Sequence, residues 1–421
     1  MRKIIIIIGA LIAALLAHAE QPWTLQQCVD TALANNRNIK QKELTRKNSE
    51  IAYQQARNNL LPNLNASASQ AWSFGRSQIA DGTYQNLNVS NTSFSLSSGI
   101  TLFDGLRMKH NIDLKMAELK NSEANLEKIR QDIILSVSTA FLQVLLNKEL
   151  LQLADNQLKL TLAKIEQQQA MVNSGKLAEG EMLELIAQKS NEELNRTQAE
   201  NSLKLSLLDL AQILELENFE QLDVVVPMDL LSNQLELLNA DAVYQSALTS
   251  RPEIKSAELQ LKSSEKNVQI AKSYLLPSLS FGASVGGGYY NSVSTPLSTN
   301  LGFSLSVPVF NKMETHNQVK SAKINVESNR LNVENTKIEL RKNIQQAYFN
   351  AVAAKSKWDA AQKSELASKE AYRFSNQKFE SGRATVYELY QAKNNLAKAQ
   401  SQIVQAKYEY VFRLKILELM K

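Results

Sequence analysis

Few side chains of this sequence combine reactive chemistry with the spacing of a reactive site. Beyond residue 19 the histidines are His110 and His316, and neither has carboxylate or cysteine neighbours at the spacing of metal ligands. The run Gly286-Gly287-Gly288 falls inside a predicted strand, and Ser174-Gly175-Lys176-Leu177 lacks the upstream glycine of a phosphate-binding loop. Because no nucleophile, acid–base dyad or cofactor fingerprint is found, the sequence predicts neither an enzyme nor a metal or cofactor.

The first 19 residues have the three-part composition of a secretory signal peptide. Arg2 and Lys3 precede an apolar run over residues 4–16, and Ala17-His18-Ala19 offers small residues for cleavage. The predicted mature chain starts at Glu20 and is exported. No later apolar run near 18 residues is evident, so the sequence predicts no transmembrane helix.

Charge and cysteine content bear on two further questions, whether the protein binds nucleic acid and whether it can form disulfide bonds. The chain has 47 basic and 42 acidic residues, and two of the basic residues lie in the predicted signal peptide, which is removed on export. This near balance argues against a nucleic-acid partner. Cys28 is the only cysteine, so no intrachain disulfide can form, and its role stays open.

Residues 278–310 alternate between apolar and small polar side chains, which is the pattern of two strands and a turn. Each arm is about 9 to 11 residues long, the length that a tilted strand needs to cross a bilayer. The turn over residues 291–298 is polar and contains Pro296. The apolar face, which we predict to contact lipid, includes Leu279, Phe281, Leu301, Phe303 and Leu305, and serine, glycine and asparagine form the other face.

A second hairpin of the same kind is predicted over residues about 63–103. Its predicted apolar face includes Leu64, Trp72, Phe94, Leu96 and Leu102, with serine and asparagine between them. Trp72, Tyr289 and Tyr290 fall near the hairpin tips, where an aromatic belt would lie. The signal of one barrel hairpin is faint, but four arms at equivalent places strengthen the prediction that they cross a membrane.

Long helices follow each hairpin. Residues 107–173 contain neither proline nor glycine, and Val137, Val144, Leu151 and Leu158 recur every seven residues. A sustained seven-residue repeat is typical of coiled-coil packing. At 1.5 Å per residue such a helix would be roughly 100 Å long. These apolar rows are therefore interpreted as packing surfaces and not as a cofactor site.

The sequence contains two copies of one internal repeat. Residues 32–64 match 247–279 without a gap, and residues 102–214 match 309–421. The predicted domains are a signal peptide over 1–19, a first repeat over 20–214, a linker over 215–240 and a second repeat over 241–421. Each repeat reads as a first helix (Leu25 to Leu60 in the first repeat), a β-hairpin and two long helices. The predicted long helices cover residues 107–173 and 178–214, then 314–380 and 384–420. The fold class is mainly α with a small β part.

Four strands cannot close a barrel, and an open edge cannot lie in lipid, where every backbone group needs a partner. Several copies must therefore share one barrel if the strands span a bilayer. An eight-stranded barrel from two copies would be filled by side chains, whereas a wider one from three leaves room for a channel.

The sequence resembles the TolC-like outer membrane efflux proteins over nearly its whole mature length. The resemblance rests on Arg251-Pro252-Glu253-Ile254, on the repeated Leu-Leu-Pro motifs that end at Pro62 and Pro277, and on Phe103-Asp104-Gly105. It implies a homotrimer in the outer membrane lipid, with a 12-stranded barrel and an α-helical tunnel in the periplasm. It also implies partners, a periplasmic adaptor and an inner-membrane pump, and the function of an exit duct for efflux or type I secretion.

The same resemblance implies a gate near the two Ser-Gly breaks, at Gly175 and Gly382. Glu181 and Glu388 match the acidic entrance positions of the family. Phe379 falls at an aromatic constriction position, whereas Ala384 replaces the gate arginine and Arg383 stands one residue earlier. Acidic residues also suit a solvated helix start, and both interpretations of the two glutamates stay open here.

A periplasmic coiled-coil adaptor, or another structural interaction protein of an export system, is the alternative function. It would share the signal peptide and the long helical hairpins but would lack four strands of lipid-spanning length. The sequence leaves open the cargo, whether drug, metal or secreted protein, and the identity of the pump and adaptor. It also leaves open whether the gate is closed at rest.

Overall fold

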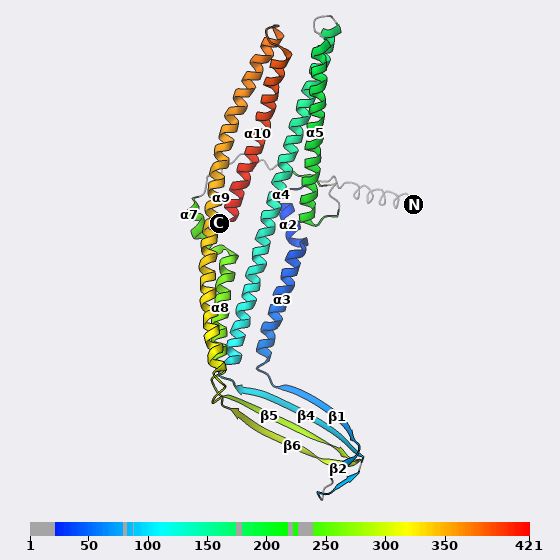
Figure 1. Ribbon diagram of the computed structural model, residues 1–421, viewed down its shortest axis with the longest axis vertical. Helices are drawn as coiled ribbons and strands as arrows, with labels where there is room; N and C mark the ends of the chain where they lie inside the picture. The colour runs from blue at the N-terminus through cyan, green and yellow to red at the C-terminus, as the bar shows by residue number, and fades with distance from the viewer. Residues whose placement is uncertain (1–21, 79–81, 87, 174–178, 218–221, 226–238) are drawn as a thin grey trace, which may run out of the picture. The chain divides into compact units, whose positions relative to one another are not determined.

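The computed structural model describes residues 22–78, 82–86, 88–173, 179–217, 222–225 and 239–421 (Figure 1). The fold is mainly helical with a small antiparallel sheet, which confirms the predicted fold class. The predicted signal peptide, Gly175 and residues 226–238 of the predicted linker lie outside the described residues.

Two compact units make up the chain, and each takes segments from both sequence repeats. The first, here called the hairpin unit, is drawn from residues 1–41, 127–251 and 338–421, and the second, the sheet unit, from 42–126 and 252–337. Helices α4 (Arg107–Asn173) and α9 (Glu314–Glu380) contribute residues to both units. Because each unit takes segments from both repeats, neither repeat forms a compact unit by itself.

The sheet unit holds four antiparallel strands in the order β1-β4-β5-β6. The predicted hairpins are the pairs β1 with β4 and β5 with β6, and pairing between β4 and β5 joins the two repeats. A separate two-stranded sheet pairs β2 with β3. The strands are β1 (Asn63–Ser73), β2 (Arg76–Gln78), β3 (Tyr84–Asn86), β4 (Val89–Phe103), β5 (Ser278–Tyr290) and β6 (Val293–Ser306).

One irregularity changes which side chain continues the apolar face of β4. The register against β5 shifts between Thr101 and Phe103, so Phe103 lies opposite Leu279. Leu102 falls within this register shift, so its predicted place on the apolar face stays a prediction. A bulge inserts one unpaired residue, and the alternation of faces changes phase there.

The glycine run of β5 allows neighbouring strands to approach closely. The register against β6 shifts between Gly286 and Gly288. A Cβ atom at Gly288 would run into the carbonyl oxygen of Thr92, and one at Gly286 would lie 2.9 Å from the carbonyl oxygen of Phe94. The run is therefore explained by strand packing.

Helices of the sheet unit are joined by ion pairs. Besides α4 and α9, the unit contains most of α3 (Arg37–Asn58) and all of α8 (Pro252–Ser273). The ammonium of Lys266 lies 2.7 Å from Asp113, and that of Lys337 lies 3.5 Å from Glu258. Helix α8 thus contacts α4 on one side and α9 on the other.

The turn from β4 into α4 explains the Phe103-Asp104-Gly105 motif. Gly105 has a φ of 67°, and a Cβ atom there would lie 2.7 Å from the carbonyl oxygen of Ser273. The Asp104 carboxylate accepts a hydrogen bond from the backbone N–H of Met108 at 3.1 Å. Glycine permits the turn, and aspartate satisfies a free N–H at the start of the helix.

The hairpin unit pairs α4 with α5 (Glu179–Leu214) and α9 with α10 (Val386–Leu419), beside the short helices α2 (Leu25–Asn35) and α7 (Ala240–Ser250). Its largest core cluster includes Phe141, Val144 and Leu210, each with no exposed surface. Val144 belongs to the predicted seven-residue row, which therefore serves packing as expected.

The helix predicted from Leu25 to Leu60 is in fact two helices. Asn36 leaves the helical conformation with a ψ of 125°. Its side-chain oxygen accepts hydrogen bonds from the N–H groups of Asn38 at 2.9 Å and Ile39 at 3.3 Å. Asparagine offers this local alternative to helix continuation, so α2 ends and α3 begins here.

Helix α4 contains an 18-residue stretch with a mean hydropathy of 1.4, which makes it apolar enough to cross a membrane by length and composition alone. The prediction that no such run follows the signal is therefore wrong. One third of that stretch is buried (33%). Because α4 also supplies Val137 and Phe141 to the core, packing between helices explains part of its apolar character.

Candidate functional site

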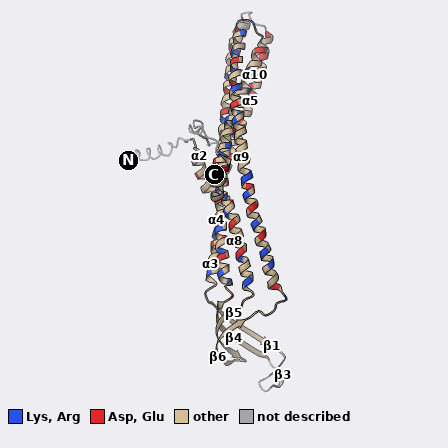
Figure 2. Cartoon of the chain, turned by 90° about the vertical axis from the view of Figure 1, so that its left-hand side faces the viewer, with Lys and Arg blue, Asp and Glu red and all other residues tan. Residues whose placement is uncertain are grey.

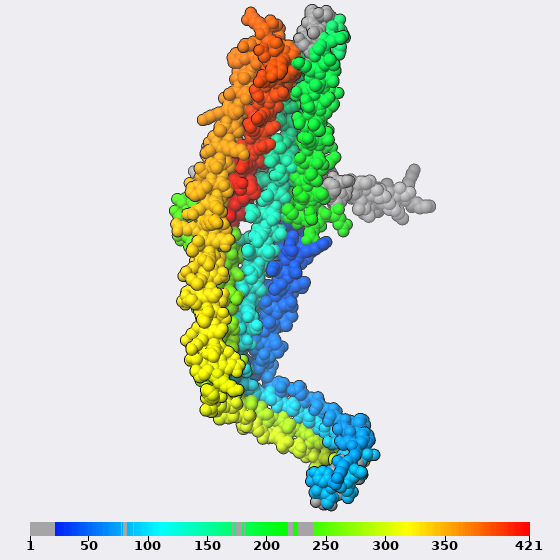
Figure 3. Space-filling view, viewed as in Figure 1, coloured from blue at the N-terminus to red at the C-terminus, as the bar shows by residue number. Residues whose placement is uncertain are grey.

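The strand register places the predicted apolar side chains on one face of the sheet. Leu279 lies opposite Leu305 and Phe281 opposite Phe303, with 5.0 Å between the two ring centroids. No helix of the sheet unit covers the side of the sheet that faces the viewer in Figure 3, and the exposure of the apolar side chains follows from their accessible surface. Large apolar side chains of this kind need a lipid or protein surface over them. Those exposed by 41% to 71% include Leu64, Trp72, Phe94, Leu96, Leu301, Phe303 and Leu305.

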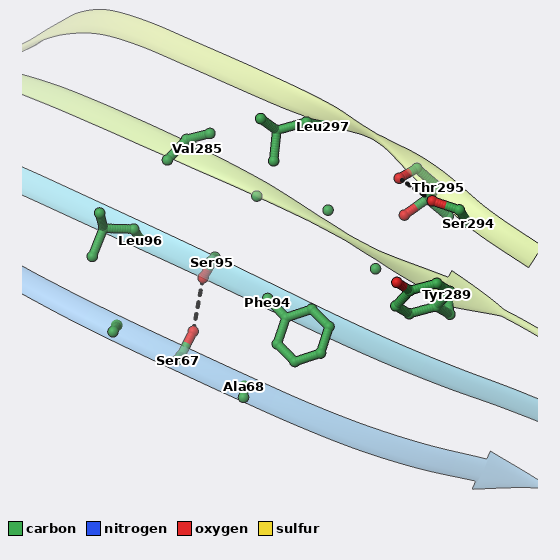
Figure 4. A pocket seen from close by; sticks show the side chains of 14 residues that line it. Ser67, Ala68, Phe94, Ser95, Leu96, Val285, Tyr289, Ser294, Thr295 and Leu297 are labelled. Atoms are coloured by element: carbon green, nitrogen blue, oxygen red, sulfur yellow. Dashed lines mark hydrogen bonds between the residues drawn. The ribbon is translucent and has the colours of Figure 1, made fainter. Parts of the chain in front are cut away.

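A shallow hollow of about 720 Å³ lies on this apolar face. Figure 4 shows Phe94, Leu96, Val285, Tyr289 and Leu297 around it, on three neighbouring strands. Gly287 leaves part of its floor without a side chain. The residues that line the hollow carry no charge.

The opposite face of the sheet is polar, and its hydroxyl groups bond to one another. The Oγ atoms of Ser67 and Ser95 lie 2.7 Å apart, as do those of Ser69 and Ser93. Each pair joins β1 to β4 across the sheet. This face therefore suits contact with water and not with hydrocarbon.

Strands β1 and β6 are the two edges of the sheet, and each pairs with one neighbour within the described chain. An edge strand leaves backbone N–H and C=O groups without a strand partner. Hydrocarbon offers these groups no hydrogen bonds. A sheet in a membrane therefore needs a further strand beside each edge.

At the second predicted tip, α9 ends in a compact turn around Gly382, which has a φ of 70°. The N–H of Gly382 donates to the carbonyl oxygen of Phe379 at 2.9 Å, and the N–H of Arg383 donates to that of Lys378 at 2.8 Å. This pair of bonds is a Schellman motif, which needs a left-handed residue and so favours glycine. The Ser-Gly break is thereby explained as a helix stop.

Glu388 takes part in a capping box at the start of α10. Its backbone N–H donates to Thr385 Oγ1 at 3.2 Å, and its carboxylate accepts from the N–H of Thr385 at 3.1 Å. These bonds support the helix-start interpretation of Glu388. Glu181 is the third residue of α5, and its side chain lies outside the described part of the structure. An acidic entrance formed by both glutamates stays a prediction.

Phe379 packs within a small apolar cluster that joins the helical hairpin α4–α5 to the helical hairpin α9–α10. It is partly buried against Leu185, Val386 and Tyr390. The ammonium of Lys164 lies 5.5 Å from the centroid of its ring, a cation–π distance. Within one chain, then, the ring holds helices together, and its predicted role as a constriction stays a prediction.

A buried ion pair that the sequence reasoning missed lies deeper between the hairpins. The ammonium of Lys393 on α10 lies 3.0 Å from the carboxylate of Glu192 on α5, and the exposed fractions of the two side chains are 9% and 7%. Lys393 also donates to Thr161 Oγ1 on α4, and Gln188 donates to Glu192 at 2.9 Å. This cluster links one helical hairpin to the other.

A sequence signal for this cluster did exist. Asn147, Thr161 and Gln168 are buried and stand on one row of seven-residue spacing along α4. Polar residues on such a row specify register and partner choice in coiled coils. Gln168 has no exposed surface, and neither atom of its side-chain amide has a hydrogen-bond partner among the residues that the structure describes.

No group of three or more histidine, cysteine and acidic side chains that could hold a metal occurs among the residues that the structure describes. Cys28 is fully buried in the core of the hairpin unit. Burial raises the pKa of its thiol to about 11, which keeps the thiol protonated near neutral pH.

Comparison with known proteins gives one family for most of the chain. The family described as Outer membrane efflux protein matches residues 28–215 and 243–419. The chain is 23% identical to Toxin and drug export protein A of Aggregatibacter actinomycetemcomitans, over 92% of this chain and 83% of that protein. It is 22% identical to Outer membrane protein TolC of Escherichia coli strain K12, over 98% of this chain and 84% of that protein.

Solved structures agree at the level of the fold. The Campylobacter jejuni CmeC outer membrane channel superimposes with a TM-score of 0.78 and 20% identity, over 94% of this chain and 85% of that one. At this identity the likeness establishes the shared fold, a helical part joined to a small β-sheet.

Proposed function

We propose that this chain, which belongs to the outer membrane efflux protein family and lies in the outer membrane, forms a homotrimeric exit duct. The main support for a trimer is the four-stranded sheet, which has one exposed apolar face and two open edges. In lipid each edge must pair with another strand. Three copies supply twelve strands, enough for a barrel with an aqueous channel.

The strand order allows such a barrel to close. Neighbouring strands are antiparallel, and the order β1-β4-β5-β6 contains an even number of strands. Strands β1 and β6 therefore run in opposite directions, so β6 of one copy can pair antiparallel with β1 of the next copy. The apolar face turns outward to lipid, and the serine-rich face turns inward to water.

The helical hairpins of the three copies extend this duct into the periplasm and end at the gate. The acidic positions Glu181 and Glu388, with Phe379 and Arg383, lie at or near the hairpin tips and would narrow the entrance. A periplasmic adaptor and an inner-membrane pump would deliver cargo there. Family membership supports these partners, and the export function named for Toxin and drug export protein A supports the direction of transport.

Lysine substitutions on the two faces of β6 test the barrel. Phe303 is 71% exposed on the apolar face, and Ser304 follows it on the other face. Phe303→Lys places a charge in lipid at a cost of about 2–4 kcal/mol per chain near mid-depth, whereas Ser304→Lys meets water. We expect Phe303→Lys, and likewise Leu305→Lys, to reduce outer-membrane trimer on unheated gels and Ser304→Lys to leave it intact. Equal trimer yields from the two faces would contradict the proposal.

Cell fractionation separates this proposal from a periplasmic adaptor. A duct co-sediments with outer-membrane barrels and needs detergent for extraction. An adaptor would be recovered from the inner membrane or the periplasm.

A further inference from the structure

The four-stranded sheet carries no charged side chain. Figure 2 shows lysine, arginine, aspartate and glutamate along the helices, whereas β1, β4, β5 and β6 are free of them. Around β5 and β6, no charged residue occurs between Lys272 and Lys312. The absence covers both faces of the sheet, although only one face would contact lipid.

Lipid explains the absence on the apolar face but not on the polar one. A charge in hydrocarbon is costly, whereas a charge on the inner face of a barrel would be solvated. The polar face instead carries serine, glycine and asparagine, such as Ser284 between Ser97 and Asn300 on the adjacent strands. Rings of charged side chains are one means by which a channel selects ions by charge, and the four strands carry none.

Two pairs of serine hydroxyls on this wall are hydrogen-bonded to each other. In the pairs Ser67 with Ser95 and Ser69 with Ser93, one hydroxyl donates to the other at 2.7 Å. One donor of each pair is thereby occupied. Conduction requires that cargo bind weakly enough to leave, and the absence of charge on this wall favours such weak binding.

We infer that the β-barrel section of the duct is an electrically neutral, hydroxyl-lined exit that does not discriminate between anionic and cationic cargo. The inference rests on the proposed function, because it takes the serine face as the inner wall. Selection by charge then takes place elsewhere, in the helical section or its partners.

Charged thiol reagents measure the potential at this wall directly. Ser95→Cys places a thiol on the polar face, and the wild-type protein serves as the blank because Cys28 is fully buried. The rates of a cationic and an anionic methanethiosulfonate are measured on intact outer membranes and compared with their rates on a small free thiol. We expect the cation-to-anion rate ratio at Ser95→Cys to match that of the free thiol within about threefold.

A matched pair of second substitutions calibrates the measurement. Ser67 lies directly opposite Ser95, so Ser67→Asp sets a negative charge about 6 Å from the thiol. At that distance in water the charge changes the ratio by about tenfold, since about 0.7 kcal/mol acts in opposite directions on the two reagents. Ser67→Asn, which is neutral and of similar shape, should leave the ratio unchanged.

The results of these labelling experiments distinguish a failure of the neutral-wall inference from a failure of the proposed duct. A ratio at Ser95→Cys that departs by more than about threefold from that of the free thiol overturns the neutral wall and leaves the duct intact. No reaction at Ser95→Cys, together with ready reaction at Phe303→Cys, overturns the duct and the wall together. Ser284→Cys on β5 repeats the measurement if Ser95→Cys does not form trimers.

Discussion

Removal of the Lys393 ammonium should destabilise the helical hairpins strongly. Lys393→Met keeps the length of the side chain but leaves the Glu192 carboxylate, whose side chain is 7% exposed, without its counter-ion. That carboxylate keeps a hydrogen bond from Gln188 at 2.9 Å, while its second oxygen has no partner. Breaking a buried ion pair by removing one partner costs about 3–5 kcal/mol.

Replacement of both partners should reverse most of this loss. In Lys393→Met with Glu192→Leu no buried charge remains, and apolar side chains of similar volume fill the space. Thr161 and Gln188 keep other hydrogen bonds, to the carbonyl oxygen of Gln157 at 3.2 Å and to Asn394 at 3.3 Å. Such double replacements are often neutral or stabilising by about 1–4 kcal/mol.

An exposed ion pair between α9 and α10 provides the matched control. Lys357 lies 2.7 Å from Glu409, closer than Lys393 to Glu192, but the exposed fractions of the two side chains are 61% and 37%. Lys357→Met should cost less than about 1 kcal/mol, because water screens such a pair. Distance alone would rank the two substitutions the other way.

Guanidinium unfolding of the detergent-solubilised protein, followed by helical circular dichroism, gives the comparison. We expect wild type, Lys357→Met and the double variant to unfold at similar guanidinium concentrations. Lys393→Met should unfold at a clearly lower concentration. The reasoning is refuted if Lys393→Met costs no more than Lys357→Met, or if the double variant is as unstable as Lys393→Met.

Three further predictions concern single positions. Cys28, buried and with a raised thiol pKa, should resist alkylation at pH 8 in the folded protein and react fully in denaturant; rapid labelling of folded protein would contradict its burial. Gly288→Ala should reduce the trimer yield because its Cβ would meet the Thr92 carbonyl oxygen, whereas Gly282→Ala, with open space around it, should not; equal yields on unheated gels would show that the strands can move apart. The hydrogen bond from Lys266 lowers the pKa of Asp113 in the folded protein, so this pair stabilises the fold above the ordinary carboxyl pKa. The stabilisation is lost as the pH falls through the lowered value. Asp113→Asn should therefore be less stable than wild type at neutral pH and equally stable in strong acid, and a difference that does not change with pH would argue against this pair.

The sequence by itself determined the local structure of both repeats. Alternation with a period of two predicts which side chains share a face, because successive strand residues point to opposite sides. The observed opposition of Phe281 and Phe303 follows that pattern. Uninterrupted seven-residue rows without proline or glycine predict continuous helices, and α4 and α9 cover residues 107–173 and 314–380 as expected.

Tertiary structure alone decided how distant segments combine. The pairing of β4 with β5 and the bulge before Phe103 depend on contacts between strands that periodicity does not encode. Lys393 and Glu192 stand 201 residues apart on different hairpins, so their pairing follows only from the packing of those hairpins. On a helix a polar residue fits a solvated face as well as a buried row, and only the neighbouring helix determines which of the two it occupies.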